Sequence, residues 1–430
     1  MIIMSQKLKN PWTTADERPH DFSMQEWWCI ESFFKTVEDK KEWSIRAYFW
    51  ECEKKSKKSL SIFDFSLFDL TEGKNVIYNT RRLTLLEKAK ERFDIRYEDS
   101  YIQGQYPNYK MFFNDKKNNI LLRINYHADA LPHWIAKDAT NGWLPMGMGV
   151  YRYGFIPKNI ITGTIQINKK TYKLKGQGYF EHVWGDFLYK DPVGGFFGLK
   201  KTFLTYIKLI SWWYQNNKIQ LPKSIMLCSE NNPLSNDWAW AVFENGWTIF
   251  YGNILFWVME GPAMGILILS KDGKNYTEFG NIWFKYKKIR YSKEFDCVYP
   301  SEIQLIAQKN KEKLHLNFKM LSKSRELIER FPDSRHWLGL IVNETPGEIN
   351  GYYHDGKEKI KLKGFCKIEP HRQISRFGHN TLKADFIYPP KGFGIKTELI
   401  SNYFKKKINM SIRLDKFPYI KFQIQKLLKI

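Results

Sequence analysis

Cysteine is scarce in this sequence, and the five that occur in 430 residues form no CxxC pair. They lie at Cys29, Cys52, Cys228, Cys297 and Cys366. An odd number of scattered cysteines argues against a disulfide framework and favours a reducing compartment, so we expect a cytoplasmic protein. The nine histidines show no HExxH or similar ligand spacing. The sequence therefore predicts no metal site, and nothing in it indicates a cofactor.

Long apolar runs are also absent. No uninterrupted stretch reaches the roughly 18 residues that a membrane-spanning helix needs, and the best one, 254–269, is broken by Glu260, Gly261 and Pro262. The opening MIIMSQKLKNPW lacks the apolar core and cleavage site of a signal peptide. We therefore expect a soluble protein or one that is peripheral to a membrane.

Acidic residues are outnumbered, with 45 Asp and Glu against 68 Lys and Arg, which gives a net charge of +23. No helix-turn-helix, RNP-like or zinc-finger pattern accompanies this charge, so we expect no nucleic-acid partner. Two explanations stay open. One is contact with an anionic membrane surface, and the other is the lysine-rich composition that AT-rich coding produces.

Aromatic residues, by contrast, are abundant at 17% of the chain. Aromatic side chains favour strands and line pockets for apolar ligands. The pattern along most of the chain is hairpin after hairpin, with alternating segments that flank short polar turns. These features favour a mainly all-β protein that binds an apolar molecule.

Two sequence patterns recur in the same order in the two halves of the chain. KLKG at 173–176 returns as KLKG at 361–364, and a glutamate follows each at the same offset, Glu181 and Glu369. A strand that opens with an acid and tryptophans also starts each half. Because a repeated supersecondary pattern indicates a duplicated unit, we expect two antiparallel barrels or sandwiches in tandem.

The expected organisation has five parts. They are an extended N-terminal segment (1–20), a first β-domain (21–190), an amphipathic helical insertion (191–236), a second β-domain (237–400) and a basic C-terminal tail (401–430). A helix is also expected at 80–93, within the first β-domain.

The run GQGYFEHVWG ends a segment that alternates as a half-buried strand does. Its apolar face carries Gly178, Phe180, His182 and Trp184. Glu181 falls on the other, mostly polar face and is expected to point outward. Glycines on the apolar face leave space in front of an imidazole and an indole. Two interpretations stay open, namely the wall of a ligand pocket and a packed core in which the histidine is satisfied.

This run, read as G-x-G-Y-x-(D/E)-H-x-W-G, resembles the signature of the hydroxyneurosporene synthase (carotenoid 1,2-hydratase) family and its AttH-like relatives. EWWCIESFF at 26–34 and DWAWAVFENG at 237–246 are similar to the family's Glu-Trp-Trp and Trp-x-Trp-Phe strands. The three motifs occur in the family's order, and the resemblance spans about residues 26–385. It implies two tandem lipocalin-like antiparallel β-barrel domains.

The resemblance also implies a catalytic site that combines His-x-Trp with a Tyr-x-Asp on a later strand. His182 and Trp184 match the first pair, and the best match to the second is Tyr251-Gly252-Asn253. Asn253 stands where the acid is expected, and an amide cannot protonate an alkene. Asp186 keeps the strand parity of His182 and is an alternative acid. For Tyr251, a catalytic role and a place in the core stay equally open.

Family members of the hydratase type add water across a terminal isoprene double bond, which requires an acid and a pocket that stabilises a tertiary carbocation. Indole and phenol faces stabilise such a cation. We therefore expect a long apolar isoprenoid-like or lipid ligand near the domain junction, contacted by Gly178, Phe180, Asn253, Trp27 and Trp238. One hypothesis adds hydratase or cyclase activity on this ligand. The other is a non-catalytic lipocalin-like carrier or sensor at a membrane surface.

The stretch 195–215 within the insertion is amphipathic at helical spacing. It contains lysines but no acid, and it ends in Trp212-Trp213-Tyr214, residue types that are favoured at a bilayer interface. Its apolar face has two possible environments, the surface of the β-domains and an anionic membrane. In the second case the expected lipid contacts are Phe196, Lys200, Lys201, Phe203, Lys208, Trp212 and Trp213.

Overall fold

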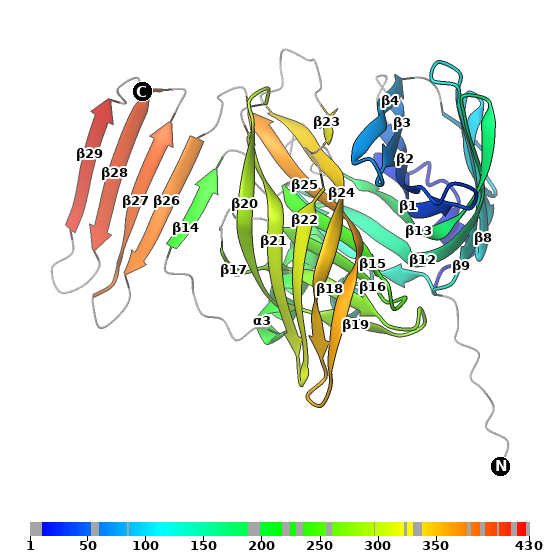
Figure 1. Cartoon of the computed structure of the whole chain (residues 1–430). Helices are drawn as coiled ribbons and strands as arrows, with labels where there is room; N and C mark the ends of the chain where they lie inside the picture. The colour runs from blue at the N-terminus through cyan, green and yellow to red at the C-terminus, as the bar shows by residue number, and fades with distance from the viewer. Residues whose placement is uncertain are drawn as a thin grey trace.

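The computed structural model describes residues 11–52, 60–83, 86–187, 198–216, 224–228, 235–254, 260–295, 297–321, 325–329, 338–375, 380–387, 392–401, 404–413 and 419–426. Most of these residues lie in three antiparallel sheets, as Figure 1 shows. The helices of this part of the chain are α1 (Thr14–Glu17), α2 (Lys137–Thr140) and α3 (Leu199–Asn216). None of them is long and apolar enough to cross a lipid bilayer.

The first sheet is a curled half-barrel made by the N-terminal part of the chain, on the right in Figure 1. Its central strands run in the order β2, β1, β13, β12 and β9. Its strands are β1 (Gln25–Thr36), β2 (Glu42–Cys52), β3 (Leu60–Asp69), β4 (Lys74–Leu83), β5 (Glu87–Lys88), β6 (Phe93–Tyr97), β7 (Ser100–Gln105), β8 (Asn108–Asp115), β9 (Ile120–Ala128), β10 (His133–Trp134), β11 (Trp143–Met146), β12 (Gly149–Ile167) and β13 (Lys170–Asp186).

The second sheet occupies the middle of Figure 1 and has a related strand order. Its opening strand β15 lies between β16 and β25, as β1 lies between β2 and β13 in the first sheet. Its strands are β15 (Asn236–Phe243), β16 (Thr248–Ile254), β17 (Glu260–Pro262), β18 (Met264–Ser270), β19 (Tyr276–Phe279), β20 (Asn281–Ser292), β21 (Cys297–Lys309), β22 (Glu312–Met320), β23 (Arg325–Glu329), β24 (Leu338–His354) and β25 (Lys359–Ser375).

A third, smaller sheet lies at the opposite end of the molecule from the first (Figure 1). Its order is β14, β26, β27, β28 and β29, so a strand from the insertion pairs with the C-terminal part of the chain. The strands are β14 (Ser224–Cys228), β26 (Asn380–Ile387), β27 (Gly394–Ser401), β28 (Lys406–Arg413) and β29 (Tyr419–Lys426). The region expected as the second domain, 237–400, therefore contributes strands to two sheets, and the expected tail contains two strands.

Apolar side chains gather in three main clusters, one inside each curled sheet and one between them. The intervening cluster combines Trp27 and Phe155 of the first sheet with Trp240 and Phe250 of the second. Burial along β1 and β13 reflects this arrangement, because nearly every residue of β1, and each residue of β13 from Gly178 to Gly185, is buried. A strand that is covered on both faces loses the alternation of a half-buried strand.

The long hairpin of β12 and β13 carries the run GQGYFEHVWG. The conformation of its turn is set by the two residues that form it. Asn168 and Lys169 connect the strands with φ values of 50° and 67°, the left-handed pair that a two-residue hairpin loop requires. The resulting register sets His182 opposite Trp28 and Trp184 opposite Glu26 on β1. Two motifs that are separated by about 150 residues thus lie side by side.

Two expectations for the N-terminal half of the chain are wrong, one for residues 80–93 and one for the segment 1–20. The described residues of the first range, 80–83 and 86–93, do not form a helix, because β4 reaches Leu83, β5 covers Glu87–Lys88 and β6 begins at Phe93. Pairing with neighbouring strands overrides the local helical preference. The described part of the N-terminal segment is not extended, since it contains α1 and inserts the buried side chain of Trp12 into the barrel core.

Candidate functional site

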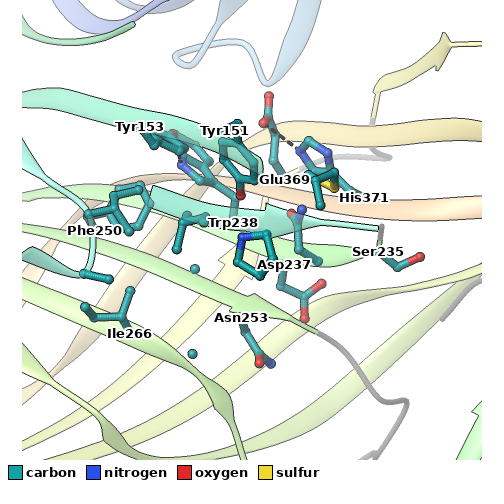
Figure 2. Close-up of a pocket in the computed structure, with 18 of the residues that line it drawn as sticks. Tyr151, Tyr153, Ser235, Asp237, Trp238, Phe250, Asn253, Ile266, Glu369 and His371 are labelled. Atoms are coloured by element: carbon teal, nitrogen blue, oxygen red, sulfur yellow. Dashed lines mark hydrogen bonds and ion pairs between the residues drawn. The ribbon is translucent and has the colours of Figure 1, made fainter. Parts of the chain in front are cut away.

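A cavity of about 150 Å³ lies between the first two sheets. Strands β1, β2, β12 and β13 supply one side, strands β15, β16, β18, β24 and β25 supply the other, and α3 contributes to the wall. The lining is mainly aromatic and aliphatic, with a few polar groups that converge on it. Figure 2 shows Tyr151, Tyr153, Trp238 and Phe250 around this space. Such an apolar pocket with a few placed polar groups is typical of a small-molecule site.

Glu181 is the central polar group on the first sheet's side of the pocket. Its Oε1 accepts a hydrogen bond from Trp27 Nε1 at 3.0 Å. Its Oε2 accepts from the hydroxyls of Tyr179, at 2.8 Å, and Tyr153. Trp238 of the second sheet donates from Nε1 to the Tyr153 hydroxyl at 2.8 Å. Three aromatic donors of the first sheet therefore hold this acid, and the second sheet supports one of them, Tyr153, through Trp238.

The environment of Glu181 favours its neutral form. Burial raises the pKa of this carboxyl to about 7, although the hydrogen bonds from Tyr153, Tyr179 and Trp27 oppose the shift. The charge of Glu369, across the interface, raises it further. Near neutral pH a large fraction of Glu181 therefore carries a proton, which is the condition for an acid catalyst.

Glu369 is the corresponding polar group on the second sheet's side. Its environment lowers the pKa of its carboxyl, whereas the pKa of Glu181 is raised. Its Oε1 lies 3.2 Å from Arg46 Nε, and its Oε2 lies 3.2 Å from Nε2 of His371, a contact drawn in Figure 2. Burial alone would raise the pKa of Glu369, but the charge of Arg46 and the bond from His371 lower it to about 2. The pocket thus pairs a carboxyl that retains its proton with one that stays ionised.

Arg46 and Lys367 link the two sheets beneath the pocket. Arg46, on β2, also reaches Glu344 of β24 at 3.1 Å. Lys367, on β25, lies 2.6 Å from Glu31 of β1 and 3.1 Å from Glu344. All of these side chains are buried. Burial opposes the charge of Arg46, but the carboxylates around it outweigh that effect and raise the pKa of the guanidinium. Removing either cation would leave buried carboxylates with one cationic partner fewer.

Several residues predicted to contact a ligand do line this pocket. Trp27 and Trp238 lie on opposite sides of it, and Asn253 is part of its wall. Asn253 pairs across the strands with Asp237, whose carboxylate bonds Arg372 Nη2 at 2.8 Å. The helix expected at 195–215 is present, and its Trp212 and Trp213 also line the pocket.

His182 and Trp184 lie in a different compartment, on the inner face of the first barrel. His182 is fully buried, with Nδ1 2.8 Å from the carbonyl of Asp16 and Nε2 2.9 Å from Glu26 Oε1. Burial lowers the pKa of His182. Phe180 and Trp184 belong to the same apolar core. None of these three side chains lines the pocket between the two sheets. The catalytic role expected of His182 and Trp184 stays a prediction.

The expectation that Glu181 points outward into solvent is wrong. Its side chain does leave the barrel on the face opposite His182, but the second sheet covers that face. Alternation along a strand assigns side chains to faces, and it contains no information about what packs on each face. The recurrence of a glutamate at the same offset in both repeats was the available signal, because Glu181 and Glu369 both reach the pocket.

The space expected beside Gly178 is occupied. A Cβ at this position would lie 2.6 Å from a ring carbon of Tyr126 and 3.0 Å from Ser32 Oγ. The Tyr126 and Ser32 hydroxyls are 2.8 Å apart. The glycine therefore allows a tyrosine to pack close to the strand. It does not leave room for a ligand.

The remaining predicted residues are placed as follows. Tyr251 is buried in the core of the second sheet. Asp186 accepts a hydrogen bond from the Met24 amide at 3.0 Å. On α3, Lys200, Phe203 and Lys208 are exposed, and the Lys201 ammonium lies over the Trp143 ring. Phe196 is outside the described residues.

Two groups of side chains in the described part of the chain have donor atoms within 4.8 Å of one another, as metal ligands would. The first is His20, Glu26 and His182, and the second is Glu31, Glu344 and Glu369. In the second group Arg46 and Lys367 already supply the positive charge. In the first, the carboxylate lies within hydrogen-bond distance of both rings.

Comparison with solved structures identifies similar architectures. The chain matches a Nitrosomonas europaea protein provisionally named AttH, with 14% identity, 84% of this chain and 97% of that chain covered, and a TM-score of 0.55. It also matches kievitone hydratase from Nectria haematococca, with 11% identity, 86% and 95% covered, and a TM-score of 0.55. The fold is lipocalin-like. No family model matches the sequence, and no curated protein matches it either.

Proposed function

We propose that this protein binds a long apolar, isoprenoid-like ligand in the interdomain pocket and hydrates one of its double bonds, with Glu181 as the proton donor. The observation that carries the proposal is a buried carboxyl, with its pKa raised to about 7, in the wall of an aromatic cavity. Alkene protonation needs a neutral acid that is close to the substrate and shielded from water. Kievitone hydratase, one of the solved structures with a similar fold, is by its name an enzyme of this reaction class.

The pocket is also suited to the charge that develops during such a reaction. Tyr151, Trp238 and Phe250 line it with aromatic rings, and the face of such a ring attracts a carbocation. The ionised carboxylate of Glu369 adds a negative charge nearby. Both effects stabilise a cation more than the neutral alkene, and stabilisation of this kind lowers the barrier.

The proposed step balances as follows. The O–H bond of Glu181 breaks, and its proton forms a C–H bond with one alkene carbon while the π electrons leave the other carbon as a tertiary cation. A water oxygen then bonds to that carbon. The surplus proton of this water passes to the imidazole of His371, which lines the pocket beside Glu369. His371 then releases this proton to solvent and Glu181 takes up one proton from solvent, so both groups are restored and the sum is alkene plus water to alcohol.

With Glu181 as the acid, hydration no longer requires a proton donor at Asn253. The sequence has an amide where the resemblance implies an acid, and that amide lines the pocket. In the proposed site the acid comes instead from β13 of the first sheet. Asn253 then contributes a polar contact to the ligand or to the attacking water.

A second candidate is a non-catalytic carrier of the same ligand class. Asn253 in place of an acid favours it, as does the mainly apolar lining. The two functions share a pocket and differ in whether Glu181 acts chemically. A carrier needs Glu181 only as a hydrogen-bond acceptor, a role that glutamine largely preserves.

The test compares Glu181→Gln with Glu17→Gln. Glu17 is a matched control because it is buried, has a raised pKa and accepts a hydrogen bond from Tyr109, yet does not line the pocket. Purified variants are incubated with geranylgeraniol or lycopene in oxygen-18-labelled water, and labelled alcohol is measured by mass spectrometry. Tryptophan fluorescence quenching gives ligand affinity.

We expect Glu181→Gln to reduce turnover by about 100-fold or more, with ligand affinity changed by less than about threefold, because it removes only the transferable proton. Glu17→Gln should turn over like the wild type. Equal turnover by Glu181→Gln and the wild type would exclude the acid role. Tight binding with no labelled alcohol from the wild type would favour the carrier.

A further inference from the structure

Helix α3 presents the apolar side chains of one of its faces to solvent. Thr202 and Thr205 are buried against the body of the protein. Phe203, Ile207 and Ile210 are 67%, 47% and 47% exposed. An amphipathic helix on a globular protein normally packs its apolar stripe on the core. Here a second set of apolar side chains lies on the outer face of the helix, where no described residue covers it.

The charged residues on the exposed face of α3 are all positive. Leu199, Leu204 and Tyr214 extend the apolar surface, and Lys200 and Lys208 lie exposed on the same helix. The helix contains no acidic residue. A solvent-exposed helix in a protein with 45 acidic residues would be expected to carry some of them. Exposed apolar residues with lysines and no acid are typical of helices that lie in an anionic bilayer surface.

The inner side of the same helix forms part of the ligand pocket. Leu209, Trp212 and Trp213 line the cavity. Trp212 packs on Gly280, where a Cβ would come within 2.7 Å of its ring, so the glycine permits this close approach. Helix α3 therefore lies between the cavity and the exposed apolar surface, with one face toward each.

Few polar contacts hold the described residues of α3 to the sheets. Trp213 Nε1 donates to the carbonyl of Ala263 at 2.6 Å. The hydroxyls of Tyr206 and Thr202 donate to the carbonyls of Gly147 and Met148 at 3.1 and 3.2 Å. All three acceptors are backbone groups in short connections between strands. Separation of the helix from the body would break these three hydrogen bonds.

From these observations we infer that α3 docks on an anionic lipid surface, with its exposed apolar side chains in the lipid and its lysines at the headgroups, and that it covers the pocket as a lid through which the ligand enters from the membrane. The exposed apolar side chains of α3 and its lysines support the docking. The lid role rests on the proposed function, because it requires an apolar ligand in the cavity.

Flotation with lipid vesicles tests the docking without any ligand. The wild type should bind vesicles of phosphatidylcholine with about a third phosphatidylglycerol, bind pure phosphatidylcholine at least about tenfold more weakly, and dissociate as salt rises to about 0.5 M. Ile207→Ser with Ile210→Ser should weaken binding by at least about tenfold. The matched control is Ile160→Ser with Ile289→Ser, which removes two isoleucines exposed elsewhere, at 46% and 37%.

The charge contribution has its own matched pair of variants. Lys200→Glu with Lys208→Glu should abolish most of the binding to anionic vesicles. Lys116→Glu with Lys117→Glu alters net charge equally in the turn between β8 and β9 and should bind nearly as the wild type does. Lys201 is left unchanged because of its contact with Trp143. Circular dichroism confirms that the variants are folded.

The outcomes separate the docking from the proposed chemistry. Equal vesicle binding by the α3 variants and their controls would overturn the inference. So would a dimer of the wild type that dissociates in the isoleucine variant, since a second copy would then cover the face. Glu181→Gln should bind vesicles normally. Geranylgeraniol offered in vesicles should be hydrated more slowly by the isoleucine variant, and at wild-type rate when offered in cyclodextrin.

Discussion

Glu181 and His182 are adjacent on β13, yet their side chains enter two separate compartments. Glu181 enters the pocket between the two sheets, where Trp27, Tyr153 and Tyr179 donate to it. His182 enters the barrel core, where it contacts Glu26 and the carbonyl of Asp16. One strand thus supplies both the polar centre of the pocket and the group that ties the N-terminal segment to the barrel.

The pH dependence of turnover follows from the protonation of Glu181. Burial raises its pKa to about 7, so the fraction of protonated acid falls as the pH rises through that value. We expect the hydration rate with geranylgeraniol to fall about tenfold for each pH unit well above pH 7. Rates measured between pH 5 and 9 check this. A rate that does not change between pH 7 and 9 would contradict the assignment.

The same shift links Glu181 to stability. Its folded pKa, about 7, lies above the ordinary value of 4.5, so between these values the folded protein holds a proton that the unfolded chain has released. Stability should therefore fall as the pH rises from 4.5 to 7, by roughly 3 kcal/mol for this group. Urea unfolding of the wild type and Glu181→Gln should show a shallower pH slope in the variant. Identical slopes would indicate an unshifted carboxyl.

Loss of Arg46 should destabilise the interface between the sheets. Arg46→Met leaves Glu344 and Glu369 buried with one cationic partner fewer. We expect the free energy of unfolding to fall by about 3–5 kcal/mol. Lys35→Met is the control, because its pair with Glu42 at 3.0 Å is largely exposed and should contribute less than about 1 kcal/mol. Similar losses in both variants, by chemical denaturation, would argue against a buried ion cluster.

His182→Ala should act mainly on folding. The substitution leaves the Glu26 carboxylate and the Asp16 carbonyl without the imidazole and opens a space beside Trp184. We expect a loss of about 2–4 kcal/mol, with the ligand affinity of the folded fraction nearly unchanged. Thermal unfolding and fluorescence quenching by geranylgeraniol measure the two effects. A stable variant with weakened affinity would instead place His182 in the ligand site.

Gly178→Ala tests whether the strand glycine packs or leaves room. The added methyl would lie 2.6 Å from the Tyr126 ring, so we expect a loss of about 1–3 kcal/mol. Gly252→Ala is the control, because its nearest neighbour, the Phe250 ring, lies at 3.3 Å and the loss should be below about 1 kcal/mol. Equal, small losses by denaturation would mean that Tyr126 does not fill the space.

The sequence by itself determined the elements that depend on local chemistry. Alternation predicted β13 and its two faces, the repeated KLKG hairpins predicted a second β-unit, and the 195–215 pattern predicted the helix that the structure has at Leu199–Asn216. These features depend on neighbouring residues, so a single chain contains the information. Between 80 and 93 the same reasoning failed, because strand pairing outweighed local propensity.

The location of the pocket was decided only by the tertiary structure. Periodicity separates the face of Phe180 and His182 from the face of Tyr179 and Glu181, but both faces are buried once the second sheet packs on the first. The pKa of Glu181 depends on that packing, because desolvation comes from residues far away in the sequence. The exposed side of α3 has the same origin. The helical pattern does not determine which residues meet the sheets, and the packing turns Thr202 and Thr205 inward together with Trp212, which lines the pocket.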